Sequence, residues 1–199
     1  IVTSSRMVSS PSGLLTFLVK SSALNRNSRL LIFQRLTTLL LVTTVLCLPA
    51  AYGTGQTIVV VGDSLSSGYG MAAEQSWVAM LTETLRSEGY GHRVVNASLA
   101  GDTSAGGLAR LPRLLEQHDP GLVIIELGGN DGLRGQPVAV LRDNLAKMIA
   151  LCSESGADVV LAGMRIPPNY GPAYTRELAA VYPELAAEHG AALIEFLLA

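Results

Sequence analysis

The chain has 199 residues, enough for one ordinary domain and an additional segment. Its charge is unevenly distributed: residues 1–53 hold five basic residues and no acidic one, whereas residues 54–199 hold nine basic and sixteen acidic residues, a formal charge of −7. Such an acidic segment has no basic stripe suited to a phosphate backbone, so nucleic acid is excluded as an expected partner.

The basic segment, residues 1–53, has the pattern of a leader with a signal peptide. Arginines precede the uncharged residues 36–48, and small residues follow at Ala51 and Gly53. An uncleaved anchor is the alternative, but this apolar core falls short of the roughly twenty residues that a membrane span needs. We therefore expect cleavage, a periplasmic or secreted domain at 54–199, and no stable membrane span afterwards.

Two cysteines, Cys47 and Cys152, are present, and only Cys152 remains after cleavage. A single thiol cannot form an intramolecular disulfide, even in an oxidising compartment. Cys152 falls on the apolar face of a predicted helix, so we expect it in the core.

Five apolar runs alternate with helical patterns along residues 54–199. The predicted strands are 58–61, 93–97, 122–127, 159–162 and 192–197, and the predicted helices are 76–88, 137–156 and 173–189. Residues 101–107 are predicted to be a glycine-rich loop, and Pro112 to open a short helix that ends at His118. Strands alternating with helices predict an α/β fold, a three-layer α/β/α sandwich around a parallel sheet.

The strongest functional candidate follows the first predicted strand. Gly62 permits a sharp turn, which places Ser64 at the carboxyl end of a buried strand, where open α/β sheets bind ligands. Ser64 is therefore a candidate nucleophile. Capping of the next helix is the alternative role for a serine at this position.

Two later loops emerge at the same edge of the predicted sheet and offer hydrogen-bond donors. Acyl transfer requires donors aimed at the developing oxyanion. Gly101 offers a backbone N–H, Asn130 a side-chain amide, and Ser64 its own N–H. A simple turn at Gly101 and an Asx turn at Asn130 remain alternatives. Carboxylates also lie at this edge, and we expect them to hold loops by accepting backbone hydrogen bonds: Asp63, Asp102 and Asp131.

Three sequence blocks, in this order, resemble the SGNH (GDSL-type) hydrolases. They are Gly62 to Ser66, Asn96 to Thr103, and Gly128 to Asp131. The phrases LARLP, ELGGNDGLRG and RIPPNYG resemble, more narrowly, the bacterial secreted multifunctional thioesterase I, lysophospholipase and arylesterase group. The resemblance covers about Gln56 to Ala199.

The resemblance implies a flavodoxin-like five-stranded sheet in the order 2-1-3-4-5 and hydrolysis of acyl esters and thioesters without a metal or organic cofactor. It implies Ser64 as the nucleophile, with an oxyanion hole made by the N–H groups of Ser64 and Gly101 and the amide of Asn130. The implied substrates are small acyl esters, thioesters or lysophospholipids, and we expect a monomer.

One part of the family pattern is missing from the sequence. The family takes its general base from a late Asp-x-x-His block, whereas His92, His118 and His189 each precede a predicted strand and so belong to the opposite edge of the sheet. A five-residue strand separates the two edges by roughly 16 Å, but a base must lie within about 3 Å of its proton. We therefore expect a hydrolase domain truncated before this block, a fragment that is inactive as written, and an active full-length enzyme.

The substrate-binding groove is predicted from apolar residues at the same edge. Met71, Leu108, Ile166 and Pro167 are expected in loops there and are candidates to line it, with ordinary packing as the alternative. Two rival functions stay open: a carbohydrate O-acetyl esterase of the same superfamily, and a non-catalytic lipid-binding module if the catalytic dyad is genuinely absent.

Overall fold

The computed structural model describes residues 55–197, and the leader with its predicted signal peptide lies outside these residues. Every described residue belongs to one compact unit, Tyr52–Ala199. Among the described residues, no helix is both long and apolar enough to cross a membrane.

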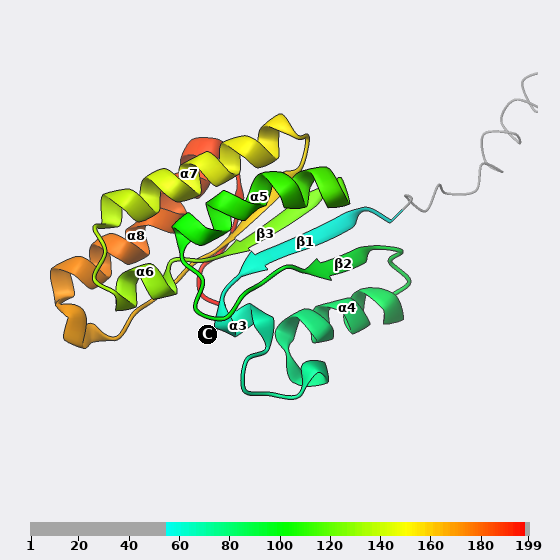
Figure 1. The fold of residues 1–199 in the computed structure, drawn as a ribbon, viewed down its shortest axis with the longest axis horizontal. Coiled ribbons are helices and arrows are strands. Elements are labelled where there is room, and N and C mark those ends of the chain that lie inside the picture. Colours follow the sequence, from blue (N-terminus) through cyan, green and yellow to red (C-terminus); the bar gives the residue numbers. More distant parts are fainter. Residues whose placement is uncertain (1–54, 198–199) are drawn as a thin grey trace, which may run out of the picture. The chain divides into compact units, whose positions relative to one another are not determined.

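This unit is built on a parallel five-stranded sheet (Figure 1). The strands are β1 Thr57–Gly62, β2 Arg93–Asn96, β3 Leu122–Glu126, β4 Asp158–Ala162 and β5 Ala192–Ile194. Their order is β2-β1-β3-β4-β5, which confirms the expected α/β fold and strand order. β1 is an interior strand, paired with β2 on one side and β3 on the other, and its continuous run of buried residues suits a strand covered on both faces.

Helices connect the strands and cover the sheet. They are α3 Ser64–Ser67, α4 Trp77–Ser87, α5 Ser104–His118, α6 Gly129–Leu133, α7 Val138–Glu154 and α8 Pro172–His189, with short 3-10 turns η2 Ala73–Gln75 and η3 Pro168–Tyr170. Predicted boundaries of α4, α7, α8 and the first four strands agree with the structure to within a few residues. The last strand is shorter than predicted, ending at Ile194.

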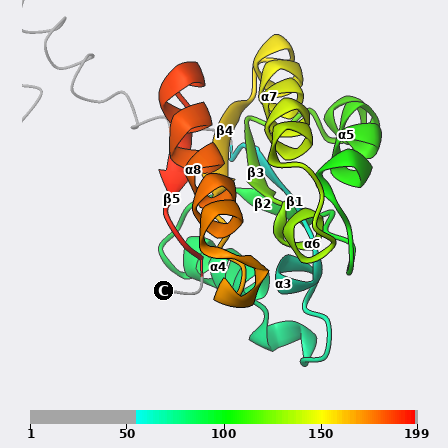
Figure 2. The same ribbon diagram turned by 90° about the vertical axis from the view of Figure 1, so that its left-hand side faces the viewer.

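The two faces of the sheet carry cores of different size. Helices α5, α7 and α8 pack on one face, and α4 packs on the other (Figure 2). The larger core includes Val59, Ile125 and Leu145, whereas the α4 face is centred on Ile58, Val60, Val78 and Ile124. Cys152 is fully buried in the larger core, as predicted, and burial raises the pKa of its thiol to about 12.

Helix α5 differs from the prediction. It begins at Ser104 rather than at Pro112, and residues 104–107 are its first turn rather than part of a glycine-rich loop. Thr103 caps the helix by accepting a hydrogen bond from the Gly106 N–H. The buried Leu111 anchors the middle of the helix, so packing offsets the cost of a proline inside it.

Core packing on α7 should dominate the stability of the domain. Leu145→Ala removes a fully buried side chain and should lower the free energy of unfolding by about 2 to 5 kcal/mol. Val140→Ala on the same helix removes a side chain that is 43% exposed and should change it by less than about 0.5 kcal/mol. Chemical denaturation of both variants tests this. Equal losses would contradict the assignment of the α7 face.

Candidate active site

Ser64 stands at a sharp turn between β1 and α3. The N-cap of α3 is Asp63, whose carboxylate accepts a hydrogen bond from the Leu65 N–H at 3.0 Å. The alternative role of Ser64 as the helix cap is therefore not what the structure shows. Ser64 is the first residue of the helix and is half-buried.

The Asn96 to Thr103 loop is bound to the end of β1. The Leu99 N–H donates to the Gly62 carbonyl at 3.0 Å, and the Asn96 side-chain amide donates to the Ser66 carbonyl at 2.7 Å. Gly101 lies in this loop with φ of 78°, a backbone conformation that favours glycine. Its carbonyl accepts a hydrogen bond from Arg134 at 2.9 Å, which ties the loop to the end of α6.

Asn130 is the second residue of α6 and faces the Ser64 turn. Its Nδ2 donates to Oδ2 of Asp63 at 2.9 Å. This contact joins residues 67 positions apart, so the side chain serves a long-range contact rather than a local Asx turn. The structure thus brings the loops of Ser64, Gly101 and Asn130 together at the carboxyl ends of β1, β2 and β3.

The three carboxylates at this edge hold loops, as expected from the sequence. Asp63 accepts from Leu65, Asp102 accepts from the Thr103 N–H at 2.9 Å, and Asp131 accepts from the Ser104 N–H at 2.9 Å. Asp131 also accepts from the Ser104 hydroxyl, to which Asn144 of α7 donates. The start of α5 is therefore fixed to the helix that carries Asn130.

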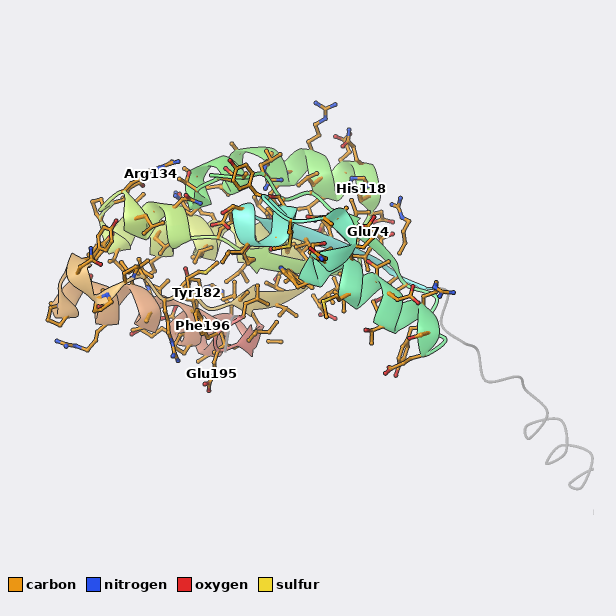
Figure 3. All side chains as sticks on the ribbon, turned by 90° about the horizontal axis from the view of Figure 1, so that it is seen from below. Glu74, His118, Arg134, Tyr182, Glu195 and Phe196 are labelled. Carbon is orange, nitrogen blue, oxygen red and sulfur yellow. The ribbon has the colours of Figure 1, made fainter. Side chains whose placement is uncertain are left out.

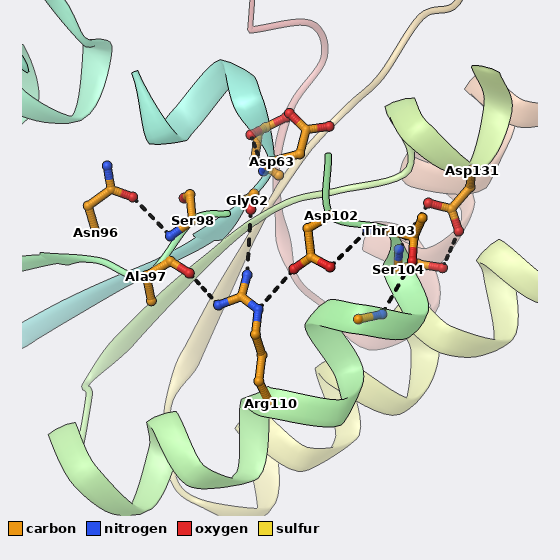
Figure 4. A network of polar contacts seen from close by, with 12 residues as sticks. Gly62, Asp63, Asn96, Ala97, Ser98, Asp102, Thr103, Ser104, Arg110 and Asp131 are labelled. Carbon is orange, nitrogen blue, oxygen red and sulfur yellow. Dashed lines mark hydrogen bonds and ion pairs between the residues drawn. The ribbon is translucent and has the colours of Figure 1, made fainter. Parts of the chain in front are cut away.

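Sequence reasoning missed Arg110, whose guanidinium lies beneath this edge. It donates to Asp102 at 2.9 Å, to the Ala97 carbonyl that follows β2, and to the Gly62 carbonyl at 3.5 Å (Figure 4). The signal was an arginine eight residues after Asp102, two helical turns along α5. The predicted helix begins after Arg110, so the sequence pattern does not place this arginine near Asp102.

Sequence reasoning also missed Glu126, a fully buried carboxyl group at the end of β3. Its Oε2 accepts hydrogen bonds from the Asp63 N–H at 3.1 Å and from the Ser66 hydroxyl at 2.5 Å. The Trp77 indole donates to the same hydroxyl at 3.1 Å. Oε1 is buried and has no hydrogen-bond partner among the described residues. Glu126 therefore anchors the turn that carries Ser64 to the sheet.

Burial and the neighbouring charge of Asp63 raise the pKa of Glu126 to about 8. Burial also raises the pKa of Asp63, while hydrogen bonds from Leu65 and Asn130 act in the opposite direction. Because the donors gather around Asp63, that residue holds the negative charge and Glu126 holds the proton at neutral pH.

The three histidines all lie at the opposite edge of the sheet. His92 contacts the Gln56 carbonyl just before β1, His118 contacts Arg93 at the start of β2, and His189 is the last residue of α8. Figure 3 shows His118 and Arg134 far apart, near opposite ends of the domain. None of these histidines is placed to serve Ser64.

The predicted groove residues occupy different environments. Met71 is 48% exposed in the turn after α3, and Pro167 is exposed just before η3. Leu108 does not lie in a loop: it belongs to α5 and packs against the larger core, because that helix starts earlier than predicted. Ile166 lies in a loop but is buried in the same core. Their contact with an acyl chain remains a prediction.

No group of three potential metal-ligating His, Cys, Asp or Glu side chains occurs within residues 55–197. The sheet order, with Ser64 at the turn after the interior strand β1, is that of an α/β fold of the serine hydrolase class. Residues 60–199 match the GDSL-like Lipase/Acylhydrolase family. The chain belongs to this family.

Several named proteins are similar to the chain. Esterase TesA of Pseudomonas aeruginosa is 54% identical over 143 residues, which are 72% of this chain and 71% of that protein. An arylesterase of Vibrio mimicus is 49% identical over 152 residues, 76% of each chain. Thioesterase 1/protease 1/lysophospholipase L1 of Escherichia coli K12 is 44% identical over 142 residues, 71% of this chain and 67% of that protein.

The fold is also that of a solved relative. A crystal structure of TesA matches with a TM-score of 0.70 at 55% identity and covers 72% of this chain and 79% of its own. These similarities confirm the family that the three sequence blocks indicated.

Because the pKa of Glu126 is raised in the folded protein, we predict that the free energy of unfolding depends on pH. The unfolded carboxyl ionises near its usual value of 4.5, while the folded one keeps its proton up to about 8. Between these values the folded state binds more protons, so stability falls as pH rises, by at most about 1.4 kcal/mol per pH unit, and levels off above pH 8.

Glu126→Gln removes this titration while keeping an acceptor for Asp63 and Ser66. Urea unfolding from pH 5 to 9 should show the wild type losing stability relative to this variant up to about pH 8. Glu154→Gln, at an exposed glutamate of α7, is the control for loss of one carboxyl group. A constant difference between wild type and Glu126→Gln at every pH would show that Glu126 does not hold the proton.

Proposed function

We propose that this protein is a serine hydrolase of acyl esters and thioesters. The observation that carries the proposal is the assembly of Ser64, Gly101 and Asn130 at one edge of the sheet, fixed by the Asn130 to Asp63 and Leu99 to Gly62 hydrogen bonds. Relatives that belong to the same family are named for esterase, arylesterase, thioesterase and lysophospholipase activities.

The chemistry begins with attack of the Ser64 Oγ on the acyl carbonyl carbon. A carbon–oxygen bond forms, the hydroxyl proton passes to a general base, and the carbonyl oxygen becomes an oxyanion. The N–H groups of Ser64 and Gly101 and the Asn130 amide are the proposed donors to that oxyanion. The tetrahedral adduct then breaks its bond to the leaving group, which takes the proton from the base and departs as the alcohol or thiol. Water attacks the acyl–Ser64 ester in the same way, which releases the carboxylic acid and returns the proton to Ser64.

The general base must come from outside the three histidines of this sequence, since all lie at the other edge. The family resemblance assigns that role to an Asp-x-x-His block. For measurements of turnover we define the completed chain as this sequence fused at its C-terminus to the Asp-x-x-His segment of a family member.

Apolar side chains beside the site support a substrate with a hydrophobic acyl chain. Leu65, next to Ser64, is 37% exposed, and Leu99, near Gly101, is 55% exposed. Met71, in the turn after α3, and Pro167, just before η3, are exposed and stay candidates for the groove. Such surfaces favour acyl chains longer than acetyl over short polar acyl groups.

Export is a further part of the proposal. The basic leader with its apolar core at residues 36–48 supports cleavage and release into the periplasm or medium. The acidic domain is proposed to act there as a monomer on small ester, thioester or lysophospholipid substrates.

Ser64→Ala should abolish turnover by the completed chain without unfolding it. The loss should be at least about 10³-fold in kcat, because no nucleophile remains and only binding and the oxyanion hole act. Hydrolysis of p-nitrophenyl acetate, a longer-chain p-nitrophenyl ester and an acyl-CoA thioester measures it. Ser153→Ala, at an exposed serine of α7, is the control.

The comparison among substrates also tests the rival function of a carbohydrate O-acetyl esterase. Faster hydrolysis of the long-chain ester supports the apolar groove, whereas activity on acetyl esters alone indicates an O-acetyl esterase. Activity retained by Ser64→Ala would refute the proposed mechanism.

A further inference from the structure

Asp63 has a structural environment that its role as a helix cap does not explain. The side chain is almost fully buried, and each of its oxygens has a separate donor. Oδ1 accepts from the Leu65 N–H at 3.0 Å, which is the cap, while Oδ2 accepts from Asn130 Nδ2 at 2.9 Å. The second contact reaches a different element, and it reaches the residue proposed as a donor to the oxyanion.

An asparagine side chain has a broad terminal torsion, and its amide has two chemically different ends. A carboxylate only accepts hydrogen bonds, so Asp63 selects the NH₂ end of Asn130 and excludes the carbonyl end from this side. One N–H of Nδ2 is then committed to Asp63. The other is left to act as a donor at the site.

Asp63 is itself held rigidly by the sheet. Its backbone N–H donates to Glu126 at the end of β3, where Gly62 and Glu126 are register partners. Glu126 also accepts from Ser66, and Trp77 donates to that hydroxyl. A continuous set of contacts therefore runs from β3 through the Ser64 turn to Asn130.

We infer that Asp63 is a positioning residue of the oxyanion hole, whose buried carboxylate fixes the Asn130 amide so that one N–H stays directed at the oxyanion formed on attack by Ser64. This inference rests on the proposed function. The negative charge of Asp63 also repels the oxyanion, so positioning and repulsion change turnover in opposite directions. The inference is that positioning of the Asn130 amide outweighs this repulsion.

Asp63→Asn in the completed chain separates these effects. The Asn Oδ1 keeps the cap on Leu65, since asparagine is a good N-cap. Its NH₂ group then faces the NH₂ group of Asn130 and cannot accept from it. We expect kcat to fall about 10- to 100-fold with KM within about twofold, since a displaced donor costs up to the value of a lost one.

A second variant of Asp63 and a control variant test this result. Asp63→Ser also retains a capping oxygen but is too short to reach Asn130, so it should show the same loss. Asp143→Asn, at an exposed aspartate of α7, removes a carboxylate from a distant surface and should leave kcat unchanged. An unchanged or increased kcat in both Asp63 variants would overturn the inference.

A double-mutant cycle shows whether Asp63 acts through Asn130. Asn130→Ala alone should lower kcat by about 10² to 10³. If Asp63 acts through this amide, adding Asp63→Asn to Asn130→Ala should lower kcat by less than about threefold further. Additive losses would show an independent structural role and overturn the inference.

The side-chain amide of Asn130 gives a second measurement that needs no activity and uses the chain as it stands. Its two N–H resonances are identified by their disappearance in Asn130→Ala. They should shift in Asp63→Asn and stay in place in Asp143→Asn, and an unmoved pair in Asp63→Asn would overturn the inference. Turnover independent of Ser64 refutes the proposed function, whereas Ser64-dependent turnover that is insensitive to Asp63 refutes this inference alone.

Discussion

The geometry of the site depends on the absence of a side chain at Gly62. A Cβ atom there would lie 2.5 Å from Glu126 Oε2 and 2.7 Å from the Ser66 hydroxyl, distances that real Cβ atoms do not adopt. The glycine therefore lets a buried carboxyl group reach across from β3 and accept from Asp63 and Ser66. The turn that presents Ser64 is shaped by this contact between neighbouring strands, and not by the turn residues alone.

Two arginines, one from α5 and one from the end of α6, hold the Asn96 to Thr103 loop against the turn that carries Ser64. Arg110, within α5, connects Asp102 with the carbonyls that end β1 and follow β2, and Arg134 binds the Gly101 carbonyl from the end of α6. Guanidinium groups suit this role because each offers several donors in a fixed plane. The loop needs such support, since Gly101 itself is exposed and has no side chain to pack.

The sequence predicts the sheet well and its polar interior poorly, for physical reasons. Buried β-branched runs identify strands because only a covered strand tolerates them, and the edge that carries Ser64 follows from parallel topology. Pro112 predicts a helix start because proline is common at that position. In the structure Pro112 lies inside α5, next to the fully buried Leu111.

The strand order and the narrower family came from the resemblance, which the comparisons confirm. Glu126 is not predicted as a site residue because its strand is otherwise apolar. The pattern of that strand predicts burial but does not predict which groups form hydrogen bonds with the Glu126 carboxyl group. Arg110 and the bond between Asp63 and Asn130 join residues distant in sequence, and no local pattern encodes such contacts. The roles of Ser64, Gly101 and Asn130 are chemical and stay predictions.

The carboxyl groups of Asp63 and Glu126 show how a site proposed to stabilise an oxyanion can also contain two acidic residues. Two ionised carboxylates beside Ser64 would repel each other and the developing negative charge. Burial moves the proton onto Glu126, which leaves one charge, and that charge lies on Asp63 among hydrogen-bond donors. The neutral acid can then brace the turn without adding to the repulsion. We expect the turn that carries Ser64 to be most stable when Glu126 is protonated and Asp63 is ionised. The burial that raises the pKa of Glu126 therefore affects both the stability of this turn and the reaction proposed for Ser64.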